Sequence, residues 1–158
     1  MAIEFKISQQ VKYGKYKACR PAVTAVMDLI EYNEDVLRDM LDFPEKIRVE
    51  FIPLRRLLNG RYFSHRHTVA INSKLTPKSM MQVLMHELVH AEQYKTGRLK
   101  RELCVRKRKY VSYWNNTEVD HADFRKSYDK YRNLPWEMEA FTRETELLTE
   151  FLNKAKTP

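Results

Sequence analysis

The stretch HELVHAEQY, residues 86–94, decides how this chain folds and what chemistry it can carry. On an α-helix, residues four apart lie on the same face, so His86 and His90 can direct imidazole nitrogens at one metal ion. Glu87 lies further round the helix, where its carboxylate can reach a water molecule on the open side of that ion. The spacing therefore predicts two metal ligands and one general base on a single helical turn.

Capping signals define the helix that carries this motif. Thr76 is a suitable N-cap, Pro77 takes the favoured first helical position, and the helix is predicted to end at Gln93 or Tyr94, before Gly97. The residues around the motif are largely apolar, which predicts a buried helix. Two histidines and a glutamate in such a helix need a compensating partner, and a zinc ion is the partner that fits them. The alternative is two histidines that share a helix by chance.

A catalytic zinc ion usually takes three protein ligands and leaves a fourth position for water. The three-histidine pattern HExxHxxGxxH of metzincins is not found in this sequence, because Gln93 and Thr96 stand where that pattern has glycine and histidine. The third ligand is therefore expected on a terminal helix that starts near Pro135 and carries Glu137 and Glu139.

Helical register separates these two glutamates. Glu137 joins an inward stripe that also contains Phe141, Glu144, Leu148 and Phe151. Glu139 lies on a charged face with Thr142, Arg143, Glu146 and Glu150. A buried carboxylate needs a cation, so Glu137 is the favoured ligand and Glu139 the alternative. The helix dipole alone also favours acidic residues in a first turn, with no metal involved.

The two motifs together resemble those of a known class. HELVHAEQY, followed by YRNLPWEMEAF at 131–141, is similar to the gluzincin class of zinc metallopeptidases, especially minimal bacterial and phage-type domains. The resemblance covers about residues 60–150. It implies a zinc ion bound by His86, His90 and Glu137, with Glu87 activating water. It also implies an edge strand at 68–72, beside which an extended peptide substrate lies.

Further candidates for the chemistry are less sharply defined. A donor usually stabilises the oxyanion of a hydrolytic reaction, and Tyr131, Tyr128 and His121 lie near the glutamate helix in the sequence. Each is also a common packing or surface residue. His65 and His67 share one face of a predicted strand, where they form a second metal site, form the outer end of a buried face, or line the mouth of the cleft.

The remaining patterns predict an α+β fold in one domain spanning residues 1–158. Residues 22–43 are expected to form a helix that begins after Pro21, and the alternation at 47–52 predicts a strand. Asn59-Gly60 signals a turn before a second strand at 61–72, and a short hairpin is expected at 111–119. The terminal helix should turn Phe141, Leu147, Leu148, Phe151 and Leu152 inward. The expected domain is minimal and zincin-like, with a small antiparallel or mixed sheet against the active-site and glutamate helices.

The chain carries a formal net charge of +8, and its most basic segment covers residues 98–109. A nucleic-acid surface can be built from Arg106, Lys107, Arg108 and Lys109, with Tyr110, Tyr113 and Trp114 as stacking surfaces. The alternative is a solvated basic loop. DNA-associated SprT-like zinc proteases combine the two features, but this chain resembles them less because their third ligand is usually histidine. A nucleic-acid-associated protein on a zincin scaffold is therefore the alternative function.

The expected partner is a peptide or protein substrate, either general or a single regulatory protein. No run of about 20 apolar residues occurs, so no membrane partner is expected, and charged residues interrupt the start of the chain, unlike a secretory signal. Cys19 and Cys104 lack any CxxC spacing and are expected to be reduced thiols. These features favour the cytoplasm. The sequence predicts neither the cleavage specificity nor the oligomeric state.

Overall fold

A four-stranded mixed sheet forms the base of the molecule, and two long helices cross one of its faces. The computed structural model describes residues 3–55, 58–120 and 127–157. The strands β1 (Ile3–Ile7), β2 (Ile47–Ile52), β4 (Thr68–Asn72) and β3 (Gly60–Phe63) lie side by side in that order. The first three are parallel, and β3 runs antiparallel to β4 at the edge. The predicted α+β class and the mixed sheet are confirmed.

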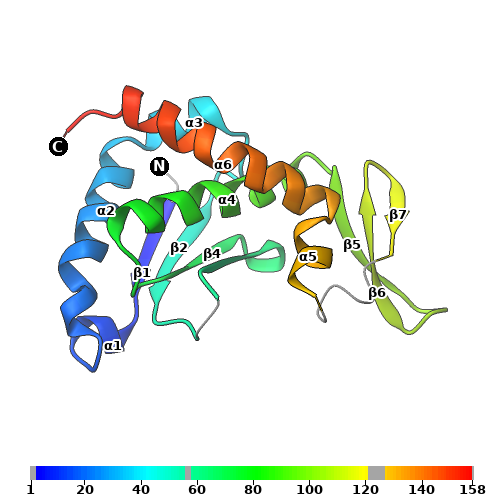
Figure 1. The fold of residues 1–158 in the computed structure, drawn as a ribbon, viewed down its shortest axis with the longest axis horizontal. Helices are drawn as coiled ribbons and strands as arrows, with labels where there is room; N and C mark the ends of the chain where they lie inside the picture. Colours follow the sequence, from blue (N-terminus) through cyan, green and yellow to red (C-terminus); the bar gives the residue numbers. More distant parts are fainter. Residues whose placement is uncertain (1–2, 56–57, 121–126, 158) are drawn as a thin grey trace.

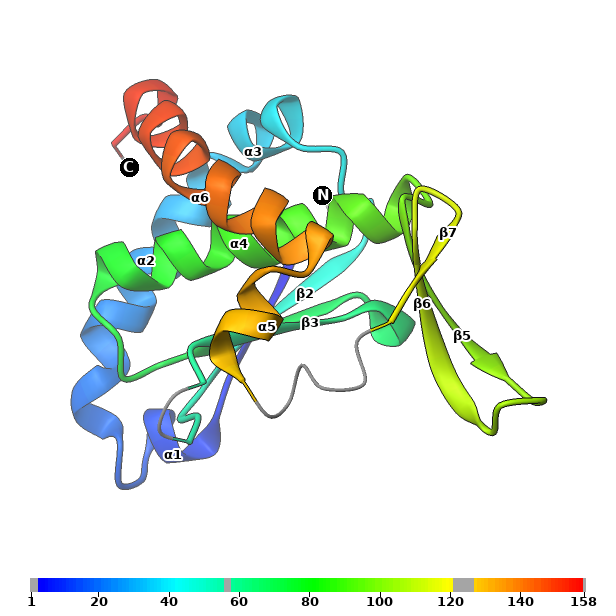
Figure 2. The same cartoon turned by 45° about the vertical axis from the view of Figure 1, so that its right-hand side comes forward.

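The helices supply most of the remaining core. They are α1 (Gln9–Lys12), α2 (Arg20–Tyr32), α3 (Glu34–Met40), α4 (Pro77–Lys95), α5 (Tyr128–Arg132) and α6 (Pro135–Lys154). Helix α4 packs on β3 and β4 with one face and against α6 with another, and Figure 2 shows it between the sheet and α6. The helix is therefore buried from two sides, as its apolar sequence predicts.

The ends of α4 follow the predicted capping signals. The hydroxyl of Thr76 accepts a hydrogen bond from the backbone N–H of Ser79 at 3.3 Å, and Pro77 is the first helical residue. Gly97 adopts a φ of +74°, a left-handed conformation that suits glycine after a helix. The helix extends to Lys95, slightly beyond the predicted end.

A second, three-stranded antiparallel sheet extends away from the body of the molecule (Figure 1). It consists of β5 (Leu99–Cys104), β6 (Lys109–Trp114) and β7 (Thr117–Val119). The predicted hairpin between β6 and β7 is confirmed, since Asn115 and Asn116 turn the chain with φ values of +48° and +65°. Strand β5 was not predicted, because its four central positions carry exposed side chains and lack a buried face.

The segment 22–43 is not one helix, so that prediction is wrong. The chain breaks at Asn33, between α2 and α3, and the Asn33 side chain is nearly fully buried. Its amide donates to the carbonyls of Leu29 at 2.9 Å and Lys156 at 3.0 Å, and its oxygen accepts from the Lys156 N–H. These bonds fix the C-terminal segment after α6. No local sequence signal indicates a partner 123 residues away.

The prediction of one strand across residues 61–72 is also wrong. A short 3₁₀ turn at Ser64–Arg66 and a left-handed His67, with φ of +45°, reverse the chain between β3 and β4. His65 is exposed, while His67 bonds to the Tyr62 hydroxyl at 3.1 Å instead of sharing a strand face with Val69. The two histidines therefore form no metal cluster within the described residues.

This reversal also changes which strand is the edge. The strand Thr68–Asn72, expected at the edge, has neighbours on both sides, and β3 lies at that edge instead, with β1 at the opposite edge. In the N-terminal part of the chain, β1 adds a parallel strand that was not predicted. On α6, Leu147, Leu148 and Phe151 are buried as predicted, but Leu152 is 49% exposed. The terminal helix begins at Pro135, as predicted.

Candidate metal centre

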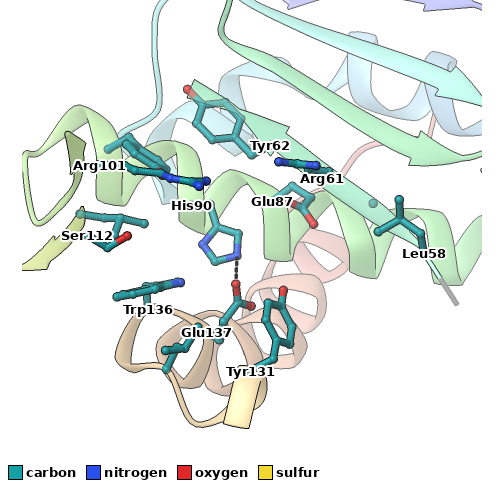
Figure 3. Close-up of a pocket in the computed structure, with 14 residues that line it drawn as sticks. Leu58, Arg61, Tyr62, Glu87, His90, Arg101, Ser112, Tyr131, Trp136 and Glu137 are labelled. Carbon is teal, nitrogen blue, oxygen red and sulfur yellow. Dashed lines mark ion pairs between the residues drawn. The ribbon is translucent and has the colours of Figure 1, made fainter. Parts of the chain in front are cut away.

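Three predicted ligand residues converge where α4 meets the first turn of α6. His86 and His90 come from α4, and their Nε2 atoms lie 3.2 Å apart. The Glu137 carboxylate approaches both, with oxygens 3.2 Å from His86 Nε2 and 3.4 Å from His90 Nε2. All three side chains are buried, and one ligand atom of each lies within 4.8 Å of the others. The group can hold a metal ion, and Figure 3 shows Glu137 facing His90.

Hydrogen bonds and charge interactions within the cluster shift the pKa values of its members. Burial opposes the charged form of Glu137, but hydrogen bonds from His86 and His90 outweigh it and lower its pKa to about 2. Burial likewise opposes protonation of His86, yet hydrogen bonds to Glu137 and Glu144 raise its pKa to about 10.

Each histidine has a second partner that fixes its ring. Gln93, which is fully buried, donates its two amide hydrogens to the Trp136 carbonyl at 3.0 Å and to Glu139 at 2.7 Å. Its oxygen must therefore accept, so His90 Nδ1 donates the bond of 2.9 Å between them. This leaves the Nε2 lone pair of neutral His90 facing the ligand cluster, the tautomer that metal coordination requires.

The ring of His86 is held in the same way by a carboxylate. His86 Nδ1 lies 2.7 Å from a Glu144 oxygen, and the other oxygen of Glu144 accepts from Gln82 at 2.8 Å. Glu144 lies two helical turns after Glu137 on the same stripe of α6, so one helix face provides a ligand and the support for another. Neither Gln93 nor Glu144 was predicted to act at the site. The signal that could have indicated them is helical spacing: Gln93 follows His90 by three residues, and Glu144 follows Glu137 by seven, so each lies on the same helix face as its neighbour at the site.

Glu139, the alternative ligand, lies outside the cluster of three. Its carboxylate accepts from Arg98 at 2.8 Å and from Arg143 at 3.3 Å, besides the bond from Gln93. Arg143 also pairs with Glu92 at 3.0 Å. Glu139 thus supports His90 indirectly, through Gln93, while its charge is balanced by arginine.

Glu87 lies beside the cluster in a confined position. The carboxylate is buried, and burial raises its pKa, against the opposing influence of the two histidines. A Cβ added at Gly60 would lie 3.3 Å from Glu87 Oε1 and only 2.3 Å from a methyl group of Val83. Glycine at position 60 therefore lets β3 approach α4 closely next to the predicted general base. The role of Gly60 was not predicted.

The three candidate oxyanion donors have different positions. Tyr131 is half-buried and hydrogen-bonded to Glu137, and burial together with that carboxylate raises its pKa, so its hydroxyl stays protonated. Figure 3 shows its hydroxyl turned toward the space beside Glu87 and Glu137. Tyr128 is 64% exposed. His121 lies outside the described residues.

Two cavities, of about 450 Å³ and 530 Å³, adjoin the cluster. His90 and Glu137 line the first and His86 lines the second, while Leu58, Gly60, Glu87 and Tyr131 line both. The two cavities therefore adjoin beside α4. Residues of β3 line one side, and residues of α5 and α6 line the other. The basic residues 106–109 lie elsewhere, exposed at the turn between β5 and β6 and at the first residue of β6.

Comparison of the chain with protein-family models, with curated proteins and with solved structures gave no match in any of the three. The arrangement of this chain's own residues is thus what supports a function. Within the ranges 3–55, 58–120 and 127–157, no helix has both the length and the apolar composition needed to span a bilayer.

Proposed function

We propose that this protein is a zinc-dependent hydrolase that cleaves peptide bonds, of the gluzincin type. The observation that carries the proposal is the convergence of His86, His90 and Glu137 beside a buried Glu87, at the junction of two cavities. Two imidazole nitrogens and one carboxylate oxygen are a donor set that zinc accepts with a position left open for chemistry. Buried polar groups of this kind are stabilised by a cation.

The metal would be held by His86, His90 and Glu137, and when bound it would polarise the substrate carbonyl and increase the acidity of water. Glu87 takes a proton from the attacking water and passes it to the leaving amine, a role that its raised pKa favours. The protonated Tyr131 hydroxyl donates to the oxygen on which negative charge develops. Gln93 and Glu144 hold the two imidazoles in the required tautomer.

A peptide is the favoured substrate because two adjoining cavities flank the ligand cluster, and Gly60, Arg61 and Tyr62 of the edge strand β3 line the first of them. Strand β3 is the last strand of its sheet, so its outer backbone groups can pair with an extended chain. Such a chain would pass Glu87 and Tyr131, which both cavities share.

The proposal is tested with the full chain and the substitution Glu87→Gln. The wild-type protein should bind one zinc ion and cleave a mixed peptide pool, with products read by mass spectrometry. Glu87→Gln should retain the zinc ion and lose turnover, because the amide keeps the shape but accepts no proton. Glu146→Gln, at an exposed glutamate on α6, is the matched control and should remain active. A wild-type protein that binds no zinc, or hydrolysis that survives Glu87→Gln, would contradict the proposal.

A further inference from the structure

Two arginines line the 450 Å³ cavity that contains His90 and Glu137. Arg61 comes from the edge strand β3, and Arg101 comes from β5 of the second sheet. In Figure 3 their guanidinium groups lie on the side of His90 opposite to Trp136 and Tyr131. Both act on the same group, since burial raises the pKa of the Tyr94 hydroxyl at this cavity and the positive charges of Arg101 and Arg61 each oppose that rise.

The two guanidinium groups are oriented but not neutralised. Arg61 stacks on the Phe63 ring at 5.0 Å, and Arg101 stacks on the Tyr110 ring at 5.2 Å. Stacking fixes the plane of a guanidinium group and leaves its N–H donors available. Among the residues that the structure describes, neither group has a carboxylate partner.

Other arginines near the ligand cluster do have carboxylate partners. Arg98 pairs with Glu139 at 2.8 Å, and Arg143 pairs with Glu92 at 3.0 Å. Acidic residues are thus available around α4 and α6, and they neutralise the arginines that support the site. Within the described part of the chain, Arg61 and Arg101 have no such carboxylate, so their charge is available to a ligand in the cavity.

The same cavity also has an apolar wall and a wall of two carboxylates that repel anions. Leu99, Leu134 and Trp136 form a small buried cluster that lines it, which suits the alkyl part of a side chain. Glu87 and Glu137 line the same cavity and would repel an anion. A substrate carboxylate in this cavity would therefore be drawn toward Arg61 and Arg101 and kept away from the ligand cluster.

We infer that this cavity is a specificity subsite that binds a carboxylate of the substrate, close to the bond that is cleaved. The inference rests on the proposed function and gives it a substrate class, namely acidic peptides. The carboxylate comes either from an aspartate or glutamate side chain or from the free C-terminus of the peptide. A paired guanidinium fork recognises both.

The test measures peptide binding by zinc-loaded Glu87→Gln protein, so that the ligand is not consumed. The probes are hexapeptides of alanine with one glutamate moved through each position, each with a glutamine twin and each with a free or amidated C-terminus. We expect at least one glutamate peptide to bind about tenfold or more tightly than its twin, as for a charge-assisted pair. The amidated set shows whether the side chain or the terminal carboxylate is bound.

The variant Arg61→Met/Arg101→Met should remove this preference. Both side chains are exposed, so methionine keeps the apolar stem without creating a buried void. The matched control is Arg106→Met/Arg108→Met, which lowers the net charge equally at exposed positions outside the cavity and should keep the preference. Equal binding of the twins, or a preference that survives in the double variant, overturns the subsite.

Hydrolysis by wild-type protein separates this inference from the proposed function. Cleavage of peptides without preference for acidic ones would overturn the subsite and leave the peptidase proposal standing. Selective binding of acidic peptides that depends on Arg61 and Arg101, without any cleavage, would support the carboxylate site and contradict the peptidase proposal.

Discussion

Polar side chains are buried and bonded to one another at the interface between α4 and α6, whereas at the tip of the sheet β5–β6–β7 they are exposed to solvent. At the interface, buried His86 bonds to two glutamates, and buried Gln93 makes three polar contacts. At the tip of the sheet, residues 105–110 are all exposed, and Val105 is 80% exposed. There Lys107 pairs with Glu118 at 2.6 Å between two side chains that are nearly half exposed.

This difference separates polar groups that need one another from polar groups that need only water. Removing a member of the buried network leaves its partners unsatisfied in a region of low dielectric constant, which costs free energy. Removing an exposed charge changes the interaction with solvent and little else. Substitutions should therefore have effects that fall steeply from the ligand cluster to the tip of the sheet.

The largest effect is expected when a ligand is removed. Zinc should raise the unfolding temperature of the wild-type protein, because an ion bound only to the folded state stabilises it by about 2.7 kcal/mol at 100 times its Kd. His86→Ala and His90→Ala should lose both this stabilisation and the bound zinc. Metal analysis and thermal unfolding with and without zinc measure the two effects. A variant that keeps a stoichiometric zinc ion would show that the ion binds elsewhere.

The partner of a ligand should matter less than the ligand itself. Glu144→Gln weakens the hydrogen bond that orients His86 and should lower zinc affinity about 10- to 100-fold, as is typical for such partners. Competition with a chelator of known affinity measures this change. Glu146→Gln, an exposed glutamate on the same helix, should leave the affinity unchanged. Equal effects of the two substitutions would mean that general charge, not orientation, governs binding.

The close approach of β3 to α4 gives an effect on folding. Gly60→Ala places a Cβ 2.3 Å from Val83 Cγ1 and should lower the free energy of unfolding by about 1–3 kcal/mol. Adding Val83→Ala removes that methyl group and should recover part of the loss. Gly97→Ala, at a φ of +74°, should cost about 1 kcal/mol that Val83→Ala does not recover. Urea unfolding of the single and double variants gives the coupling.

The same contrast explains how far sequence reasoning reached. The residues of α4 were predicted well, because the spacing of His86, Glu87 and His90 and the caps at Thr76 and Gly97 are local signals. Register also favoured Glu137 over Glu139, and the structure brings Glu137 to the histidines. The zinc ion and the peptidase activity stay predictions.

The features that were missed depend on pairing between distant segments. The reversal at His67 makes β3 an edge strand, and strand periodicity cannot distinguish one long strand from two that fold back. Arg61 and Arg101 come from different sheets, 40 positions apart in a sequence rich in basic residues. Only the folded chain shows that these two arginines line the cavity beside the ligand cluster, while other arginines are ion-paired or lie away from it.

The smallest effect is expected at the tip of the second sheet. Replacing Arg106, Lys107, Arg108 and Lys109 together by glutamine should change the free energy of unfolding by no more than about 0.5 kcal/mol per site and leave zinc affinity unaltered, because these exposed side chains line neither cavity. The same variant tests the predicted nucleic-acid surface. If the variant binds a DNA duplex more weakly than the wild-type protein at low salt, and the slope of log K against log salt concentration falls by about 0.9 per lost phosphate contact, the tip is a polyanion surface. Equal behaviour of the two proteins means that the charges are solvated. A change in zinc affinity would contradict the difference between the buried interface and the exposed tip. It would mean that the tip is coupled to the ligand cluster through β5, the strand that contains Arg101.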